Sequence, residues 1–191
     1  MRATHCERCR TAVAFEAQHC PRCHAMLGYV PRDRTIRALS PTTDPAVFDV
    51  DGDDQTWWRC LNAAWGCNWM VPAAAGDIWC RSCRLTRGRP DEERTDAVQA
   101  WMTAEGAKRR LVHQLDSLAL PIVARSPEAP DGLAFDLVHL DDDSAITGHA
   151  GGVVTLDLAE TDDTHRDLVR EQLSEQYRTV IGHLRHEIGH H

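Results

Sequence analysis

The sequence His186-Glu187-Ile188-Gly189-His190 lies close to the end of a 191-residue chain and has the spacing H-E-x-x-H. On a helix, two histidines four residues apart share one face, so their imidazoles can bind one Zn²⁺. The glutamate between them can take a proton from a water that the metal activates. This stretch therefore predicts a hydrolytic zinc site with His186 and His190 as metal ligands and Glu187 as the catalytic residue.

The predicted site lacks one component. A catalytic zinc needs a third protein ligand, which in most sites of this kind lies after the second histidine, and the chain ends at His191. We therefore expect a domain truncated after its active-site helix, whose catalytic competence is doubtful in these 191 residues. If the ligand lies upstream instead, the candidates are Asp157, Glu160, Glu171 and Glu175.

The motif helix is expected to have two different faces. At about 100° per residue its apolar residues fall within one arc of about 100°, the width of a core-facing stripe. They are Tyr177, Val180, Ile181, Leu184 and Ile188. His186 and His190 project to the opposite side, which predicts a histidine face open to a cleft. The alternative, polar histidines on an exposed helix, is less favoured because the glutamate and the stripe accompany them. We assign neither His183 nor His191 as a ligand.

Eight cysteines indicate structural metal rather than disulfides. The N-terminus has no apolar signal core and no apolar run could cross a bilayer, so we expect a cytoplasmic protein whose thiols stay reduced. Six of the cysteines form C-x-x-C pairs, and the remaining two form a wider pair. The sequence thus predicts two structural Zn²⁺ sites, with the ligand sets Cys6, Cys9, Cys20, Cys23 and Cys60, Cys67, Cys80, Cys83.

The chain divides into four predicted regions. Residues 1–30 form a zinc ribbon with too few large apolar side chains for a core of its own. Residues 31–56, with three prolines and an acidic cluster at 49–54, are interpreted as a linker; the acids lack the ligand order of a calcium loop. Residues 57–89 form a second four-cysteine module. Residues 90–191 form a zincin-like domain, and the fold class is α+β.

The C-terminal region alternates helix and strand patterns. Acids after Pro90 and apolar residues at steps of three and four predict a helix that ends before Pro121. Strand-like runs at 133–140 and 146–158, broken by turn-like stretches at 141–144 and 148–152, predict an antiparallel sheet. The strand at 152–158, the later part of the second run, could be the sheet edge to which an extended peptide adds. A polar helix over 162–173 then leads to the motif helix.

Charge differs between the two halves of the chain. Residues 1–90 carry 12 Lys and Arg against 9 Asp and Glu, whereas residues 91–191 carry 9 against 20. The overall charge of −8 disfavours a general nucleic-acid binder. Tryptophans and arginines around the second module could nevertheless form a base-stacking surface. We favour the interpretation that these tryptophans pack around the zinc site.

The order of several sequence blocks resembles that of bacterial zinc-binding metallopeptidases with an N-terminal zinc ribbon. Besides the Cys6–Cys23 ribbon and the motif, the blocks are Cys67-Asn68-Trp69, Val71-Pro72, Cys80-Arg81-Ser82-Cys83-Arg84-Leu85-Thr86, Ala107-Lys108-Arg109-Arg110-Leu111, Gly132-Leu133-Ala134-Phe135, Thr147-Gly148-His149, Tyr177-Arg178-Thr179 and Gly182-His183. Members of that family continue past the motif, so this chain resembles roughly their first two-thirds. The resemblance implies zinc-dependent peptide hydrolysis.

Two function classes follow from these observations. In the first, the protein is a zinc metallopeptidase acting on a peptide or protein, with a possible protein partner at the ribbons and no contact with nucleic acid or membrane. In the second, it is a zinc-ribbon module that binds protein or nucleic acid, and its C-terminal domain is catalytically incomplete. A complete set of zinc ligands at the motif would distinguish the first class from the second.

Overall fold

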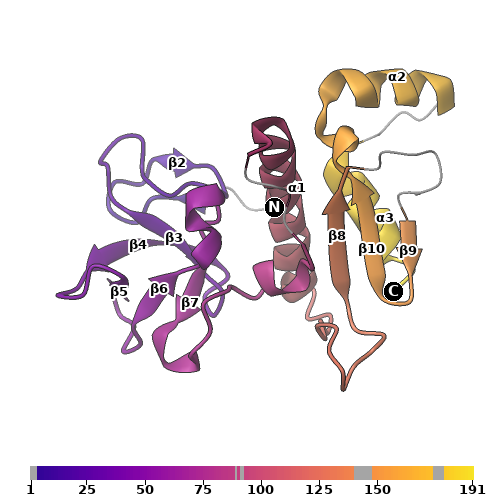
Figure 1. Cartoon of the computed structure of the whole chain (residues 1–191). Coiled ribbons are helices and arrows are strands. Elements are labelled where there is room, and N and C mark those ends of the chain that lie inside the picture. Colours follow the sequence, from indigo (N-terminus) through magenta and orange to yellow (C-terminus); the bar gives the residue numbers. More distant parts are fainter. Residues whose placement is uncertain (1–3, 89, 91–92, 140–147, 174–178) are drawn as a thin grey trace. The chain divides into compact units, whose positions relative to one another are not determined.

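The computed structural model describes residues 4–88, 90, 93–139, 148–173 and 179–191, and it divides the chain into two compact units (Figure 1). Unit 1 comprises Met1–Cys83, and unit 2 comprises Arg84–His191. Helices and strands are both present, which confirms the predicted α+β class. Among the described residues, no helix combines the length and apolar character that a membrane span requires.

Unit 1 is built from short antiparallel strands. A two-stranded ribbon pairs β1 (Thr4–His5) with β2 (Ala12–Val13). A five-stranded sheet follows in sequence order, with every neighbouring pair antiparallel. Its strands are β3 (Leu27–Val30), β4 (Thr35–Pro41), β5 (Val47–Val50), β6 (Trp57–Arg59) and β7 (Met70–Pro72). The backbone N–H of Tyr29 in β3 donates to the carbonyl of Asn68 at 2.7 Å, so the first strand meets the chain that leads into the last.

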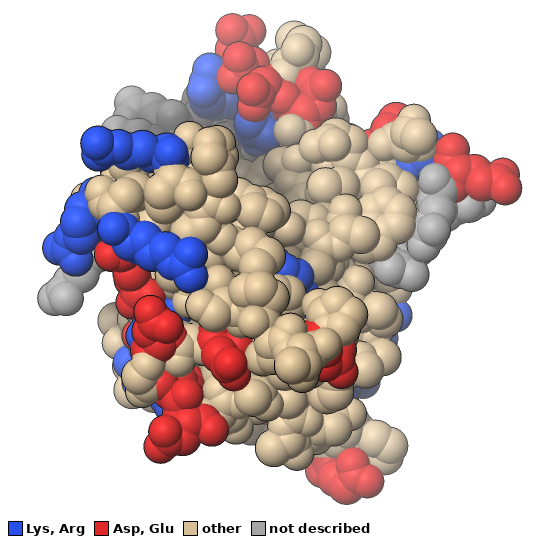
Figure 2. Space-filling model, turned by 90° about the vertical axis from the view of Figure 1, so that its left-hand side faces the viewer, with Lys and Arg blue, Asp and Glu red and all other residues tan. Residues whose placement is uncertain are grey.

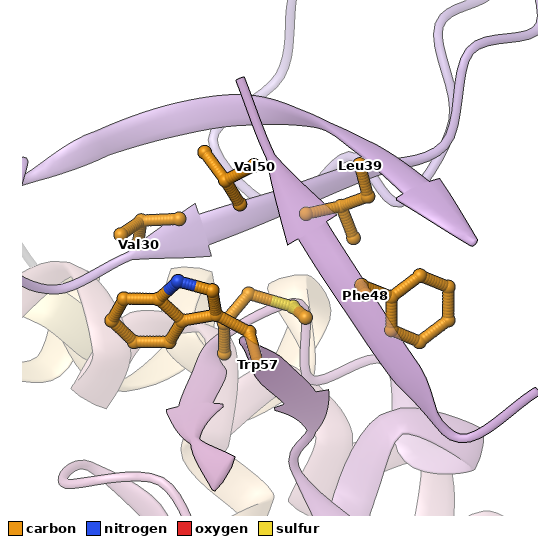
Figure 3. Packing of buried hydrophobic residues seen from close by; sticks show 6 residues of the cluster. Val30, Leu39, Phe48, Val50 and Trp57 are labelled. Carbon is orange, nitrogen blue, oxygen red and sulfur yellow. The ribbon is translucent and has the colours of Figure 1, made fainter. Parts of the chain in front are cut away.

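One apolar cluster holds the five-stranded sheet together (Figure 3). Its members come from all five strands and are Val30, Leu39, Phe48, Val50, Trp57 and Met70. Gly28 lies directly against it, because a Cβ at this position would come within 2.5 Å of Met70 Sδ and 2.7 Å of its Cγ, so the Met70 side chain would have to shift. Burial of these side chains gives unit 1 a core that does not depend only on metal.

The predicted linker over 31–56 is wrong, because this segment contains β4 and β5. The burial pattern of β4 places Ile36, Ala38 and Leu39 inside, and Phe48 and Val50 of β5 are buried as well. The prolines suggested a break, but Pro41 lies at the last position of β4, where a strand tolerates it. The unit boundary also falls after Cys83 rather than after residue 89.

Unit 2 combines three helices with a three-stranded sheet. The helices are α1 (Thr95–Ser117), α2 (Asp163–Leu173) and α3 (Val180–Ile188). The strands are β8 (Ala134–Val138), β9 (Gly148–Ala150) and β10 (Val153–Asp157). A 3-10 turn, η4 (Leu158–Thr161), lies between β10 and α2, and η3 (Cys83–Leu85) spans the boundary of the two units. In unit 1, the 3-10 turns are η1 (Leu61–Trp65) and η2 (Ala73–Ala75).

The sheet of unit 2 is mixed rather than antiparallel. Its order is β8-β10-β9, with β10 parallel to β8 and antiparallel to β9. The predicted edge at 152–158 is therefore wrong, because β10 is the central strand and β9 lies at the edge of the described sheet. The predicted turn at 148–152 is a strand followed by a turn at Gly151 and Gly152, both with positive φ. The stretch 141–144 lies outside the described residues.

The motif helix packs inside unit 2. Helix α3 contacts α1, β9 and β10, and Arg185 Nε donates a hydrogen bond to Gln114 Oε1 of α1 at 2.9 Å. Val180 and Leu184 are buried, and Ile181 and Ile188 are half-buried. The predicted apolar stripe is confirmed for these four residues, and Tyr177 lies outside the described part of the chain.

Candidate functional site

The first four predicted cysteine ligands converge on one point. Their four Sγ atoms all lie within 4.8 Å of one another, with Cys6 and Cys23 at 3.6 Å and Cys9 and Cys20 at 3.5 Å. Tetrahedral zinc with bonds of about 2.3 Å places sulfurs about 3.8 Å apart, so the cluster fits this metal.

Two similar backbone turns produce this convergence. In the first, Arg10 N–H donates to the carbonyl of Cys6 at 2.8 Å, and in the second, His24 N–H donates to the carbonyl of Cys20 at 3.0 Å. Arg10 and His24 both have positive φ, at 62° and 57°. Each C-x-x-C pair therefore folds into a tight knuckle that turns both sulfurs inward.

The second four cysteines also converge, in a more enclosed position. Cys67 Sγ lies 3.7 Å from Cys80 Sγ and 3.7 Å from Cys83 Sγ, and all four sulfurs again lie within 4.8 Å of one another. Backbone N–H groups of Cys80 and Cys83 donate to the sulfurs of Cys60 and Cys80. Gly66, with φ of 82°, ends η1 and returns the chain to Cys67. The wide Cys60/Cys67 pair is thus accommodated by a 3-10 turn.

The electrostatics of the clusters favour a dication. In the first cluster, the side chain and backbone of Thr11 lower the pKa of Cys9 to about 6. The pKa of Cys23 rises to about 12, because desolvation and the neighbouring thiols outweigh a hydrogen bond from the backbone of Ala25. Thiols this close cannot all ionise beside one another without a cation that compensates their charge.

The pKa values of the thiols in the second cluster are also shifted in opposite directions. Hydrogen bonds from Cys67, Cys80 and Cys83 lower the pKa of Cys60. The pKa of Cys67 is raised by its hydrogen bond with Cys60, and that of Cys80 is raised chiefly by desolvation. One thiolate is stabilised at the expense of its neighbours, and a bound Zn²⁺ would stabilise all four.

The two histidines of the motif lie close together in the structure. Thr179 caps the helix, since its Oγ1 accepts a hydrogen bond from Gly182 N–H at 3.0 Å. Helix α3 ends at Ile188, and His190 lies in the turn that follows. The backbone N–H of His190 donates a hydrogen bond to the carbonyl of Glu187 at 3.1 Å. The Nε2 atoms of His186 and His190 are 3.4 Å apart, close to the roughly 3.3 Å expected for two ligands of tetrahedral zinc.

The three residues of the motif differ in exposure. His186 and His190 are exposed, and Glu187 is half-buried between them. Because the apolar stripe faces α1 and the sheet, the histidine face lies on the open side of the helix. Glu187 is less accessible to solvent than either histidine.

A third ligand does not join this pair among the described residues. The described groups of three or more metal-binding side chains are the two cysteine clusters. The Asp157 carboxylate caps η4, because it accepts a hydrogen bond from Ala159 N–H at 2.9 Å. Glu160 is buried, and Glu171 is exposed on α2. Glu175 lies outside the described residues. The upstream candidates that can be placed therefore do not complete the site.

His149 lies near the motif, which sequence reasoning did not anticipate. It belongs to the edge strand β9, and its ring centroid is 5.6 Å from that of His191. Its Nε2 is buried without a hydrogen-bond partner among the described residues. Only the antiparallel pairing of β9 with β10 brings this histidine to α3, so sequence periodicity contained no signal for it.

A buried charge cluster in unit 2 was also missed. Lys108, the single lysine of the sequence, is fully buried, and its Nζ lies 2.6 Å from Glu105 Oε1. Thr86 bonds to both residues, and Nζ lies 5.7 Å from the ring centroid of Phe135. Thr86, Lys108 and Phe135 come from three sequence blocks of the family resemblance, which unit 2 packs together.

Comparison with known proteins assigns both regions to zinc-binding families. Residues 97–191 match the family described as "Putative zinc-binding metallo-peptidase", and residues 3–94 match a zinc-ribbon domain family. Uncharacterized proteins of Mycobacterium bovis and Mycobacterium tuberculosis are 41% identical over 192 residues. The alignment covers 100% of this chain and 53% of each relative, so the chain spans about half the length of these curated relatives. No solved structure matches. The resemblance seen in the sequence is confirmed.

Proposed function

Because its residues 97–191 match the family described as "Putative zinc-binding metallo-peptidase", we propose that the protein hydrolyses peptide bonds at a zinc ion held by His186 and His190. The observation that carries this proposal is the 3.4 Å separation of the two Nε2 atoms on the open face of α3. Two exposed imidazoles held this close, with a carboxylate between them in sequence, suit metal binding better than solvation alone.

The proposed chemistry assigns one task to each residue. Zinc, when bound, acidifies a water and polarises the carbonyl of the scissile bond. Glu187 takes a proton from the attacking water and then passes it to the leaving amine. Arg185 positions the helix through Gln114 on α1, so the motif stays aligned with the body of unit 2.

The geometry also supports a binding mode for the substrate. Strand β9 pairs with β10 on one side and lies at the edge of the described sheet, next to α3. We propose that an extended peptide pairs with the free side of β9, which would place its backbone beside the histidine pair. The substrate class is therefore an unfolded or flexible segment of a peptide or protein.

The third zinc ligand is proposed to lie outside the described residues. Within the chain, the undescribed segments 140–147 and 174–178 contain Asp141, Asp142, Asp143 and Glu175. The curated relatives are also about twice as long as the aligned region, so their additional sequence is a second source. Chelator sensitivity of the 191-residue chain and of a form extended to the length of the relatives would distinguish these sources.

We propose that any partner of unit 1 is a protein rather than a nucleic acid. Arg37 pairs with Glu7 at 2.5 Å and with Asp33, and Arg32 pairs with Asp53 at 2.8 Å. Figure 2 shows acidic side chains beside basic ones on one face of the molecule. Trp57 and Trp69 are buried, so these two rings are not available for base stacking.

The test is a peptidase assay on an unfolded protein substrate with zinc present. The 191-residue chain and the extended form are each compared with Glu187→Gln, which retains the histidines, and with Glu171→Gln on the exposed surface of α2 as control. We expect cleavage in the extended form, little in the shorter chain, and a loss of at least about 100-fold with Glu187→Gln alone. Cleavage that survives Glu187→Gln would contradict the proposal, and inactivity of every form would favour the zinc-ribbon binding module.

A further inference from the structure

The two cysteine clusters differ in how far their sulfurs are shielded. In the second cluster, Cys60, Cys67, Cys80 and Cys83 are all buried, with exposures of 1%, 0%, 1% and 5%. In the first cluster only Cys6 and Cys20 are buried, whereas Cys9 is half-buried and Cys23 is exposed. The accessible thiolates of the protein therefore belong to one of its two clusters.

The charged surroundings of the first cluster add to this difference. Arg22 and His24 flank Cys23 and are both exposed, and Arg8 and Arg10 flank Cys9 and are exposed as well. Because Cys23 and both of its neighbours are exposed, its sulfur is accessible to a small oxidant in solution. The sulfurs of the second cluster are instead shielded from solvent, and two of them accept backbone hydrogen bonds inside unit 1.

We infer that the first cluster is an oxidation site, at which a hydroperoxide converts the Cys23 and Cys6 thiolates into a disulfide and so removes two zinc ligands. Cys23 is the exposed sulfur, and Cys6 Sγ is a buried neighbour at 3.6 Å. The second cluster keeps its metal under the same conditions. This inference concerns unit 1 and is independent of the proposed peptidase activity.

The reaction balances without further components. The Cys23 thiolate attacks the terminal peroxide oxygen, the O–O bond breaks, and Cys23 becomes a sulfenic acid while an alcohol or water leaves. The Cys6 thiolate then attacks the Cys23 sulfur and displaces hydroxide. Two thiolates, one hydroperoxide and two protons thus give one disulfide, one alcohol or water, and one water. The sulfurs lose two electrons and the peroxide gains two.

The experiment uses the 191-residue chain carrying His186→Ala and His190→Ala, so that all retained zinc is held by cysteines. The zinc-loaded protein is treated with hydrogen peroxide in small excess, and released zinc is followed with a chromogenic chelator. Free thiols are then alkylated, and every cysteine is mapped by mass spectrometry. We expect release of about one zinc equivalent per chain, a Cys6–Cys23 disulfide, and no oxidation at 60–83.

Two controls make the outcome decisive. Denatured protein should lose the selectivity, because all eight thiols are then equally accessible. The variant Arg22→Glu, at a residue that is not a ligand, should keep its zinc content and the same order of oxidation, because the selectivity depends on the exposure of the Cys23 sulfur. Equal or earlier oxidation of Cys60, Cys67, Cys80 or Cys83, or no release from either cluster, would overturn the inference.

Discussion

The Nε2 atoms of His186 and His190 lie 3.4 Å apart, although the helix that carries His186 ends before His190 is reached. The turn after Ile188 keeps the second ring beside the first, with ring centroids 5.0 Å apart. A pair spaced like two ligands of one tetrahedral metal is thus present in the described part of unit 2 without a third ligand.

The first prediction concerns this pair. The double variant His186→Ala/His190→Ala should bind about one zinc fewer per chain in a zinc titration, and the lost zinc should be the one that weak chelators remove first. His165→Ala on α2 is the matched control, because His165 lies outside the motif on the same unit. An unchanged zinc stoichiometry in the double variant would mean that the motif does not bind metal.

The second prediction concerns the cysteine clusters. Purified protein should retain about two zinc ions per chain after mild chelation, and Cys67→Ser should lose one of them together with the folded state of unit 1. Cys67 is fully buried, so its loss removes a ligand where solvent cannot replace it. Elemental analysis gives the zinc content, and tryptophan fluorescence, to which the buried Trp57 and Trp69 contribute, reports the core. Less than one zinc per chain, or four disulfides, would contradict this assignment.

Sequence patterns predicted the two cysteine clusters better than they predicted the pairing of strands. Both cysteine sets converge as their spacing predicts, because a knuckle is a local structure, whereas metal binding by the histidine pair stays a prediction. The apolar stripe of α3 was predicted for the same reason. In contrast, the sequence pattern of β4 and β5 predicts a linker, because the pairing with β3 and β6 that stabilises these strands is not visible in a local pattern. The direction of β10 relative to β8 is likewise a tertiary property that no periodicity contains.

Buried charge was the other feature that sequence reasoning could not place. The segment around Lys108 and Arg109 has the composition of an exposed helix face, yet both residues are buried. The free-energy cost of burying these two charges is offset because Glu105, one turn earlier in α1, pairs with both of them. Thr86, which lies outside the helix, accepts a hydrogen bond from Lys108. Asp53 is a similar case, since it was counted as part of an acidic loop but its side chain is only 1% exposed.

The third prediction concerns the buried pair in α1. Lys108→Met should lower the free energy of unfolding by about 3–5 kcal/mol, because it leaves the Glu105 carboxylate buried without its closest cation. Arg170→Met removes an exposed pair with Asp167 of the same spacing and should cost less than about 1 kcal/mol. Urea denaturation measures both values. A double variant Lys108→Met/Glu105→Gln that costs much less than the sum of its single changes would demonstrate the coupling.

The fourth prediction concerns Asp53 and pH. Burial alone would raise its pKa, but hydrogen bonds from Gln55 N–H, Trp57 Nε1 and Arg32 lower the pKa below the usual value. A lowered folded-state pKa stabilises the fold above the unfolded-state pKa, and this contribution is lost as the pH falls through the folded-state value. Asp53→Ala should therefore lower the free energy of unfolding of unit 1 at neutral pH by about 1–3 kcal/mol, because the Trp57 Nε1 donor loses its acceptor. The destabilisation should be smaller in acid.

Asp54→Ala is the control for this pH dependence. Asp54 is the exposed neighbour and carries the same charge, so its removal tests the effect of net charge alone. Thermal unfolding of both variants between neutral and acidic pH gives the comparison. A difference between wild type and Asp53→Ala that grows as the pH falls would refute the assigned role of this carboxylate.

The last prediction separates backbone strain from steric contact in the turn between β9 and β10. Gly151 and Gly152 both have positive φ, at 52° and 82°, so alanine is strained at either position. A Cβ on Gly151 would meet open space, whereas a Cβ on Gly152 would collide with the carbonyl of Gly132 and the backbone of Asp131. Backbone cannot move aside as a flexible side chain can.

Gly152→Ala should therefore cost about 1–3 kcal/mol more than Gly151→Ala in urea denaturation. It should also weaken zinc binding at the histidine pair, because this turn holds β9 beside α3. Equal costs for the two substitutions would mean that the 131–132 backbone yields and that the position of β9 does not depend on this contact.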